Sequence, residues 1–189
     1  MFENLLEWDR ELFLWLNGLG TSFFDSFWLL LTHKATNVWV YLVVAAYYYK
    51  KRGVKPLLLL LLTVAVLILI TDQTTNLFKN GVGRLRPCHD VEIGALVRLV
   101  KASCGGQYGF FSGHASNSFA LATFFSLVWR PYSRKLAYFF FTLAALIAYS
   151  RVYVGVHYPL DILAGGVAGS LFGIIAFKIF KTLRWVRLK

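Results

Sequence analysis

The sequence contains few acidic residues and few charges of any kind. Nine aspartates and glutamates stand against 20 lysines and arginines, and charged residues make up 15% of the 189 positions. Hydrophobic residues account for 58%, and the mean hydropathy is +0.58. These values exclude an ordinary water-soluble domain, whose surface needs more polar residues. They indicate an all-α, polytopic membrane protein, and the length suits one domain over residues 1–189.

The N-terminus lacks a basic segment ahead of its apolar residues. Residues 1–18 read MFENLLEWDRELFLWLNG and carry acids throughout. This pattern argues against a cleavable signal peptide. The apolar side chains recur at helical spacing, so we expect an N-terminal helix that lies along the membrane interface.

Long runs without charge predict about five transmembrane helices. Each run is somewhat short for a full span, but flanking residues and snorkelling Lys or Arg side chains can extend it. The runs are 35–49, 57–71, 115–129, 136–150 and 162–177. A further apolar segment, 22–33, is short and contains Asp25. It is either interfacial or the start of the first span.

Twelve basic residues are gathered between or after these runs, on one predicted side and without acidic neighbours. They are Lys50, Lys51, Arg52, Lys55, Arg130, Arg134, Lys135, Lys178, Lys181, Arg184, Arg187 and Lys189. The positive-inside rule makes this side cytoplasmic, so the loops 79–111 and 150–158 face outward. Topology thus explains most of the net charge of +11. Nucleic-acid binding is not expected, because no extramembrane domain is predicted.

A polar stretch between the last two runs, residues 150–161, reads SRVYVGVHYPLD. His157 and Asp161 are four residues apart and would share one face of a helix. The carboxylate could accept one ring N–H and leave the other ring nitrogen free to attack. Arg151 brings a fork of donors suited to phosphate. Taken alone, the stretch is equally compatible with a membrane-edge arginine and a helix-capping aspartate.

Residues 79–87 read KNGVGRLRP and follow the second run. Lys79 and Arg86 are seven residues apart, a spacing that places two side chains on one face of a continuous helix. Positive charge on the outward side is contrary to the positive-inside rule, so a purely topological role does not explain this cluster.

Residues 111–116 read FSGHAS and precede the third run. Ser112 and Gly113 near a helix start can offer backbone N–H groups to an anion. His114 could serve as a general acid, although a lone interfacial histidine is more often structural. Combined with the other two stretches, the set supplies cations for a phosphate, a nucleophile and a proton donor. It favours phosphoryl transfer through a phosphohistidine.

The three stretches resemble the signature of the type 2 phosphatidic acid phosphatase and vanadium haloperoxidase superfamily. The pattern K-x6-RP matches residues 79–87, and SR-x5-H-x3-D matches residues 150–161. The pattern PSGH matches residues 111–114, except that Phe111 replaces the proline. Order and spacing are intact over residues 79–161.

The resemblance implies a bundle of membrane helices with a phosphatase site that needs no metal and no cofactor. His157 would attack the phosphorus, Asp161 would orient His157, and His114 would protonate the leaving oxygen. The phosphoryl oxygens would be held by Lys79, Arg86, Arg151, Ser112 and the Gly113 N–H.

These features predict a lipid phosphatase at the outer face of the cytoplasmic membrane. Undecaprenyl diphosphate is the preferred substrate, with phosphatidylglycerophosphate, phosphatidate and lipid A phosphates as alternatives. A haloperoxidase that binds vanadate is the second enzymatic interpretation, and the five predicted spans argue against it. A transporter or non-catalytic lipid binder is the third interpretation, and the intact pair of histidines argues against it.

Several residues outside the signature are also candidates for a role. Asp72 and Asn76 should hydrogen-bond within the site or to a neighbouring helix. Gly165, Gly169 and Gly173 form two GxxxG steps, which allow close helix packing within the bundle or in a homo-oligomer. Arg84 is expected to be a solvated cation, and contact with a second phosphate or a lipid headgroup is the alternative.

Cys88 and Cys104 are the only cysteines in the sequence. Both lie in the predicted outward loop, where an oxidising compartment would preserve a disulfide. Such a bridge would tie the end of the first motif near the start of the second. A metal site that includes His89 is less favoured, because no fourth ligand is evident.

Overall fold

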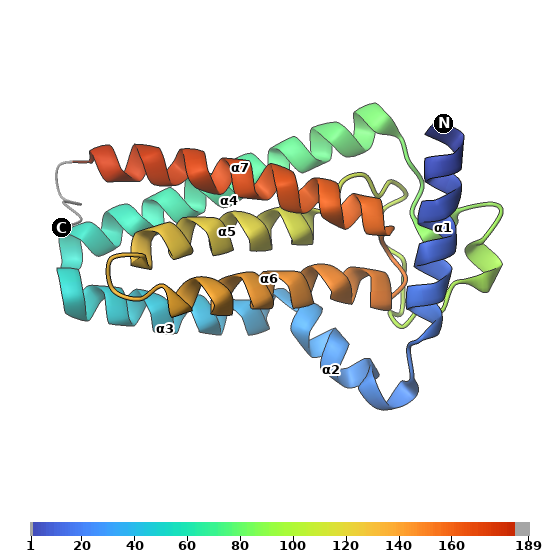
Figure 1. Ribbon diagram of the computed structural model, residues 1–189, viewed down its shortest axis with the longest axis horizontal. Coiled ribbons are helices and arrows are strands. Elements are labelled where there is room, and N and C mark those ends of the chain that lie inside the picture. Colours follow the sequence, from blue (N-terminus) through green and yellow to red (C-terminus); the bar gives the residue numbers. More distant parts are fainter. Residues whose placement is uncertain (1, 184–189) are drawn as a thin grey trace.

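The computed structural model describes residues 2–183, and these residues form an all-α molecule (Figure 1). The prediction of an all-α fold is therefore confirmed. A bundle is built from five helices: α3 (Lys34–Arg52), α4 (Val54–Val82), α5 (Gly113–Trp129), α6 (Lys135–Tyr153) and α7 (Pro159–Thr182). Helices α1 (Phe2–Gly18) and α2 (Ser22–Thr32) precede it. The long loop between α4 and α5 contains two short 3-10 turns, Pro87–His89 and Gly94–Leu96.

Helix α5 lies in the centre of the bundle and packs against α4, α6 and α7 (Figure 1). It is apolar or small on all sides, as expected of a helix with no face toward water. Its buried core residues include Ala120, Leu121, Ala122, Phe124, Phe125, Val128 and Trp129. Since α5 begins at the second motif, the core of the bundle also fixes the position of that motif.

The glycine face of α7 packs against α5 of the same chain. A Cβ atom at Gly165 would lie 2.6 Å from the Ser112 carbonyl oxygen, and one at Gly173 would lie 2.5 Å from the Ala120 oxygen. Gly169 faces the Ser116 backbone in the same way. This face is thus buried inside the bundle. The suggestion that it mediates a homo-oligomer is wrong, because α5 already covers it.

Three of the described helices, α4, α6 and α7, are long and apolar enough to cross a membrane. Helix α5 has 17 residues, or about 26 Å at 1.5 Å per residue, slightly less than a typical hydrocarbon core. Helices α3 and α5 cover the predicted spans 35–49 and 115–129. They lie alongside the other three helices (Figure 1), and the full count of five spans stays a prediction.

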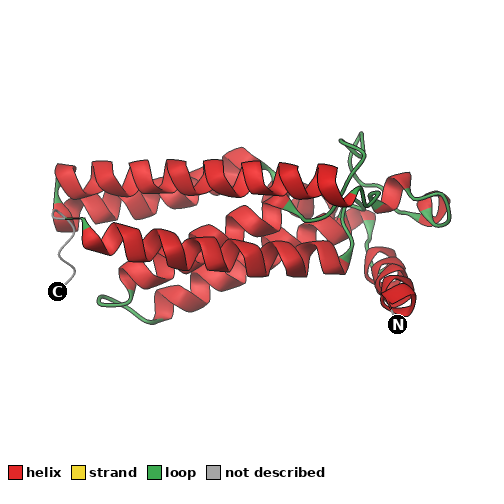
Figure 2. Cartoon of the chain, turned by 90° about the horizontal axis from the view of Figure 1, so that it is seen from above, coloured by secondary structure: helices red, strands yellow, loops and turns green. Residues whose placement is uncertain are grey.

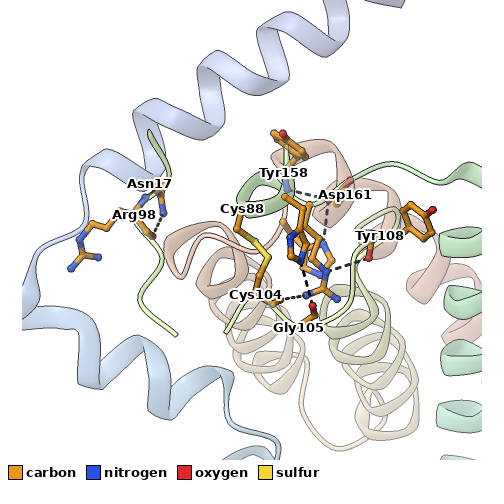
Figure 3. Close-up of a disulfide and its surroundings, with 11 residues drawn as sticks. Asn17, Cys88, Arg98, Cys104, Gly105, Tyr108, Tyr158 and Asp161 are labelled. Carbon is orange, nitrogen blue, oxygen red and sulfur yellow. Dashed lines mark hydrogen bonds and ion pairs between the residues drawn. A yellow bond between two sulfur atoms is a disulfide. The ribbon is translucent and has the colours of Figure 1, made fainter. Parts of the chain in front are cut away.

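Helix α1 lies across one end of the bundle (Figures 1 and 2). Trp8 and Trp15 are 66% and 62% exposed, as suits a helix at a membrane surface. Its other face is anchored by polar contacts. The Asn17 amide donates to the carbonyl oxygens of Val152 and Tyr153 at 3.1 and 2.9 Å, and it accepts from the Arg98 N–H (Figure 3).

Helix α2 is separate from the bundle helix that follows it. It ends at Thr32, and His33 has an extended backbone before α3 begins at Lys34. The segment 22–33 is therefore not the continuous start of the first predicted span.

The predicted cytoplasmic clusters meet at one end of the bundle. The α3–α4 turn, the α5–α6 loop and the end of α7 lie together there, and the loop between α4 and α5 lies at the other end (Figure 1). Arg184, Arg187 and Lys189 lie outside the described residues. The three motifs are all at the opposite end from the clusters.

Candidate active site

The three motifs line one polar cavity of about 360 Å³ at the α1 end of the bundle. The cavity is bounded by the end of α4, the start of α5, the end of α6 and the loop before α7. Six of the predicted site residues face it: Lys79, Arg86, Gly113, His114, Arg151 and His157. Residues that are up to 78 positions apart, from Lys79 to His157, are therefore brought together as the sequence predicts.

The end of α4 separates Lys79 from the rest of the first motif. Gly83 adopts a left-handed conformation with φ of 66°, and its N–H donates to the Lys79 carbonyl oxygen at 3.0 Å. Glycine tolerates this conformation, which ends a helix and turns the chain. The turn allows Lys79 on the helix and Arg86 in the loop to reach the same cavity.

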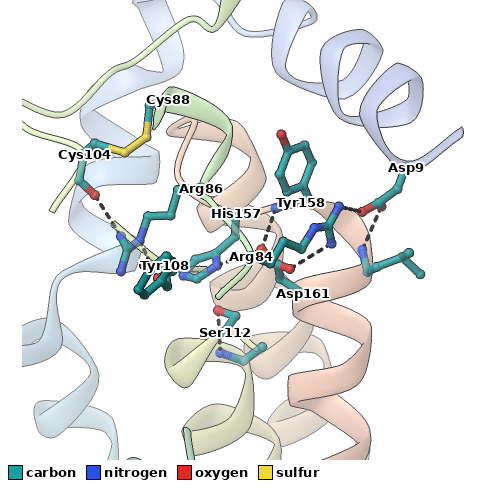
Figure 4. Close-up of polar contacts among 12 residues, drawn as sticks. Asp9, Arg84, Arg86, Cys88, Cys104, Tyr108, Ser112, His157, Tyr158 and Asp161 are labelled. Atoms are coloured by element: carbon teal, nitrogen blue, oxygen red, sulfur yellow. Dashed lines mark hydrogen bonds and ion pairs between the residues drawn. A yellow bond between two sulfur atoms is a disulfide. The ribbon is translucent and has the colours of Figure 1, made fainter. Parts of the chain in front are cut away.

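Arg86 is held by the loop that leads to the second motif. Its Nε donates to the Tyr108 carbonyl oxygen at 3.2 Å, and its Nη1 donates to the Cys104 oxygen at 2.8 Å (Figure 4). Cys104 is joined to Cys88 by a disulfide. Cys88 follows Arg86 by two residues, and Cys104 accepts its hydrogen bond, so both cysteines of the bridge lie close to Arg86.

Arg151 is almost fully buried, with 4% exposure, at the end of α6. Its Nη1 donates to the hydroxyl of Thr32, the last residue of α2. Within residues 2–183, no protein acceptor meets its buried Nε. A buried donor of this kind is normally paired, so Arg151 has hydrogen-bonding capacity left for an anion in the cavity.

His157 and Asp161 form the expected pair. The distance from Nδ1 of His157 to Oδ2 of Asp161 is 3.2 Å, and the two side chains are 2% and 0% exposed. The Asp161 carboxylate also accepts the Tyr158 N–H at 3.1 Å (Figure 4). With Nδ1 as the donor, Nε2 carries the free lone pair. Burial lowers the pKa of His157, and the nearby charges of Arg151, Arg86 and Lys79 lower it further.

The start of α5 supplies the second motif. Gly113 lines the cavity and faces α4, since a Cβ atom there would lie 3.4 Å from the Thr75 side chain. Ser112 is fully buried and caps α5 by accepting the Ala115 N–H at 3.5 Å. Ser112 is not among the residues that line the cavity, and its phosphate contact stays a prediction. Phe111, at the position of the family proline, stacks against Phe78.

The two candidate supporting residues on α4 both line the cavity. Asp72 accepts a hydrogen bond from the Asn117 side chain of α5 at 2.8 Å. Asn117 also bonds the Thr71 hydroxyl. Asp72 therefore links α4 to α5 at the cavity wall, and Asn76 lies in the same wall.

The expectation for Arg84 was wrong. Its side chain is 16% exposed and contacts two carboxylates, Asp9 of α1 and Asp161 (Figure 4). Two buried acids within reach are a far better partner for a cation than solvent is, because each acid would otherwise lack a countercharge. The pairing could not be foreseen, since Asp9 and Arg84 are 75 residues apart.

Gly109 is a second site residue that the sequence patterns did not indicate. A Cβ atom there would lie 2.9 Å from Oδ2 of Asp161 and 3.6 Å from Nδ1 of His157. Its N–H donates to the Arg84 carbonyl oxygen at 2.8 Å. A glycine two residues before the second motif was the available signal, but glycine is common in loops for its backbone freedom alone.

Comparison with known proteins now identifies the family. A family model described as the PAP2 superfamily matches residues 56–185. The chain belongs to this superfamily. The match includes all three motifs and most of the bundle.

Two relatives are similar over nearly the whole chain. A lipid A 4'-phosphatase of Porphyromonas gingivalis is 34% identical over 94% of this chain and 75% of its own length. A lipid A 4'-phosphatase of Bacteroides thetaiotaomicron is 36% identical over 97% of this chain and 84% of its own length. In contrast, a putative undecaprenyl-diphosphatase of Escherichia coli is 44% identical over 33% of this chain and 30% of its own length.

The fold is also that of a solved family member. The crystal structure of a transmembrane PAP2-type phosphatidylglycerolphosphate phosphatase from Bacillus subtilis superposes with a TM-score of 0.74. It covers 98% of this chain and 90% of the other, at 17% identity. This protein is thus an integral membrane lipid phosphatase of the PAP2 superfamily, a phosphomonoester hydrolase.

Proposed function

We propose that this phosphatase removes a phosphate from a lipid A-type glycolipid at the outer face of the cytoplasmic membrane. The observation that carries the proposal is the similarity to two lipid A 4'-phosphatases over almost the entire chain. Similarity to undecaprenyl-diphosphatases is partial. Undecaprenyl diphosphate, which the sequence alone favoured, becomes the second candidate.

The reaction would proceed in two steps through His157. Nε2 attacks the phosphorus, the P–O bond to the lipid breaks, and His114 gives a proton to the leaving oxygen. Water then attacks the phosphohistidine, with His114 accepting a proton, and inorganic phosphate is released. The Nδ1 contact at 3.2 Å lets Asp161 stabilise the positively charged ring of the intermediate.

The cations of the cavity would stabilise the charge of the transferring group. Lys79, Arg86 and Arg151 line the cavity around His157, and the Gly113 N–H lies at the start of α5. Donors held in place beforehand stabilise a transition state without reorganisation. The protein hydrogen bonds of Arg86 and Arg151 provide this fixation.

An apolar pocket next to the cavity supports a substrate with acyl chains. Its volume is about 230 Å³, and it shares Asp72, His114 and Asn117 with the polar cavity. The remaining walls are mostly apolar residues of α3, α4, α5 and α6, among them Val38, Tyr41, Ile68, Leu121 and Ile147. A phosphate in the polar cavity could therefore stay attached to a chain that runs into the bilayer.

The location of the clusters supports the outward orientation of the site. Arg130, Lys135 and Lys178 stand at the end of the bundle opposite the cavity, where the positive-inside rule expects the cytoplasm.

Lys101→Cys should react with an impermeant thiol reagent in intact cells, and Arg130→Cys should not, in a background that lacks Cys88 and Cys104. The reverse labelling would place the site in the cytoplasm.

A substrate panel tests the proposed activity. Phosphate release by the purified protein in detergent is compared for lipid A, undecaprenyl diphosphate, phosphatidylglycerophosphate and phosphatidate, with and without chelator. The highest kcat/KM is expected for lipid A, and the chelator should have no effect. A clear preference for another lipid would reject lipid A as the substrate, and loss of activity in chelator would reject the metal-independent mechanism.

A further inference from the structure

Helix α1 reaches the catalytic pair through one arginine. Nη2 of Arg84 lies 2.6 Å from Oδ2 of Asp9, and Nη1 of Arg84 lies 3.0 Å from Oδ1 of Asp161 (Figure 4). Asp9 is 4% exposed and lies with Phe13 and Asn17 on the buried face of α1. The three side chains thus form a buried chain of charges from α1 to α7.

The two oxygens of Asp161 have different partners. Oδ1 bonds Arg84, whereas Oδ2 bonds His157 and the Tyr158 N–H. A carboxylate held on both sides cannot rotate without losing one set of contacts. The Arg84 contact therefore fixes the orientation in which Oδ2 meets the His157 ring.

Arg84 is fixed by two further contacts of its own and by one of its partner Asp9. Its guanidinium lies 4.1 Å from the centre of the Tyr158 ring, a cation–π distance. Asp9 in turn accepts the Leu160 N–H at 2.9 Å through Oδ1. The Arg84 carbonyl oxygen accepts the Gly109 N–H. These contacts surround the first turn of α7, where Asp161 is located.

Neither Asp9 nor Arg84 lines the phosphate cavity. They would therefore not contact a phosphate in the cavity, and the residues that they hold are their direct link to the reaction. We propose that Asp9 and Arg84 are positioning residues that orient Asp161, and through it His157, so that α1 is part of the catalytic apparatus. This inference rests on the proposed reaction at His157.

The test compares Asp9→Asn and Arg84→Gln with a matched control, Arg10→Gln. Arg10 is the next residue on α1, is 34% exposed, and pairs with Asp90 and Glu92 of the loop between α4 and α5. Asp9→Asn and Arg84→Gln should lower kcat by roughly 10–100-fold. This is the loss seen in metal enzymes when a group that orients a metal-binding side chain is removed. KM should not change, because the cavity wall is intact. Arg10→Gln should retain the kcat of the unaltered enzyme.

A double-mutant cycle with Asp161→Asn separates positioning from a merely structural role. If Asp9 acts through Asp161, then Asp9→Asn should cost nothing further in the Asp161→Asn background. Arg84→Lys, which keeps the charge, should recover part of the loss. Melting temperatures of all variants are measured in the same detergent, and if Arg84→Gln does not fold, Asp9→Asn and Arg84→Lys carry the test.

The proposal is overturned if the folded variants keep full kcat, if KM changes instead, or if the losses are additive with that of Asp161→Asn. The assay uses whichever lipid the unaltered enzyme hydrolyses fastest. A wrong choice of physiological lipid would then appear in the unaltered enzyme, whereas a wrong positioning role would appear only in the variants.

Discussion

The two ends of the helix bundle both carry cations, but in different surroundings. At the end with the α5–α6 loop, Arg130, Arg134 and Lys135 are exposed, and the predicted clusters contain no acid. At the other end, Arg84 and Arg151 are mostly buried, and Arg84 contacts two carboxylates. Exposed cations are solvated and cost little, whereas buried ones need partners. The first end thus fits the predicted role in topology. At the second end Arg84 is paired within the protein, whereas the buried Nε of Arg151 meets no acceptor among the described residues, which favours the proposed anion site.

The largest expected contrast between the ends is catalytic. His157→Ala removes the proposed nucleophile and should lower phosphate release by about 10⁴-fold or more. Lys135→Ala, an exposed change at the other end, should leave kcat intact. The measurement is phosphate release from the preferred lipid, together with trapping of a phosphorylated enzyme. Normal turnover in the His157→Ala protein would reject the mechanism.

The disulfide belongs to the site end, and its loss should be the next largest effect. Cys88 and Cys104 are 16 positions apart, and closing a loop of this size contributes about 3 kcal/mol in the chain-entropy model. Cys104→Ser should lower the melting temperature. It should also lower kcat, because the bridge holds in place the residue 104 carbonyl oxygen that accepts from Arg86. Two freely alkylatable thiols in the denatured, non-reduced protein would show that the bridge does not form.

A pair of glycine substitutions tests how tightly α7 packs against α5, the helix that begins at the site. Gly169→Ala inserts a methyl group against the Ser116 backbone and should destabilise the protein by about 1–3 kcal/mol. Gly81→Ala, on the exposed side of α4 with nothing within 4 Å of the new atom, should stabilise by about 0.5–1 kcal/mol. Thermal melting in detergent measures both. Equal melting temperatures would contradict the tight α5–α7 contact.

The pH response should show the smallest effect. Burial and three neighbouring cations lower the pKa of His157, so the neutral nucleophile persists below about pH 6.5, the ordinary histidine value. The acid limb of kcat/KM should therefore lie below that pH. The unfolded chain binds a proton there that the folded one does not, so stability should fall as pH drops below 6.5.

Two variants assign this pH response. The part of the stability change that comes from His157 should disappear in His157→Gln. The same part should persist in His89→Gln, a control at an exposed histidine, because that variant keeps His157. An acid limb above pH 6.5 that belongs to His157 would contradict the direction of the shift.

Much of the fold and site can be predicted from the sequence, because the signals are local. Charge-free runs indicate membrane helices, and their flanking cations indicate the orientation. Each motif spans fewer than thirteen positions. His157 and Asp161 are in contact as their spacing predicts, but not on one helix face, because His157 lies in the loop before α7 and Asp161 in its first turn. The family and the cavity residues follow from these local patterns. Substrate choice does not, since the motifs are predicted to contact only the phosphate that all the candidate lipids share.

Other features were decided by tertiary structure alone. Arg84 reads as a solvated cation until α1 brings Asp9 to it, and the α7 glycines have no known partner until α5 packs against them. The physical reason is the same in each case. The role of a residue depends on the groups that surround it. Here those groups are brought close by helices that are distant in sequence.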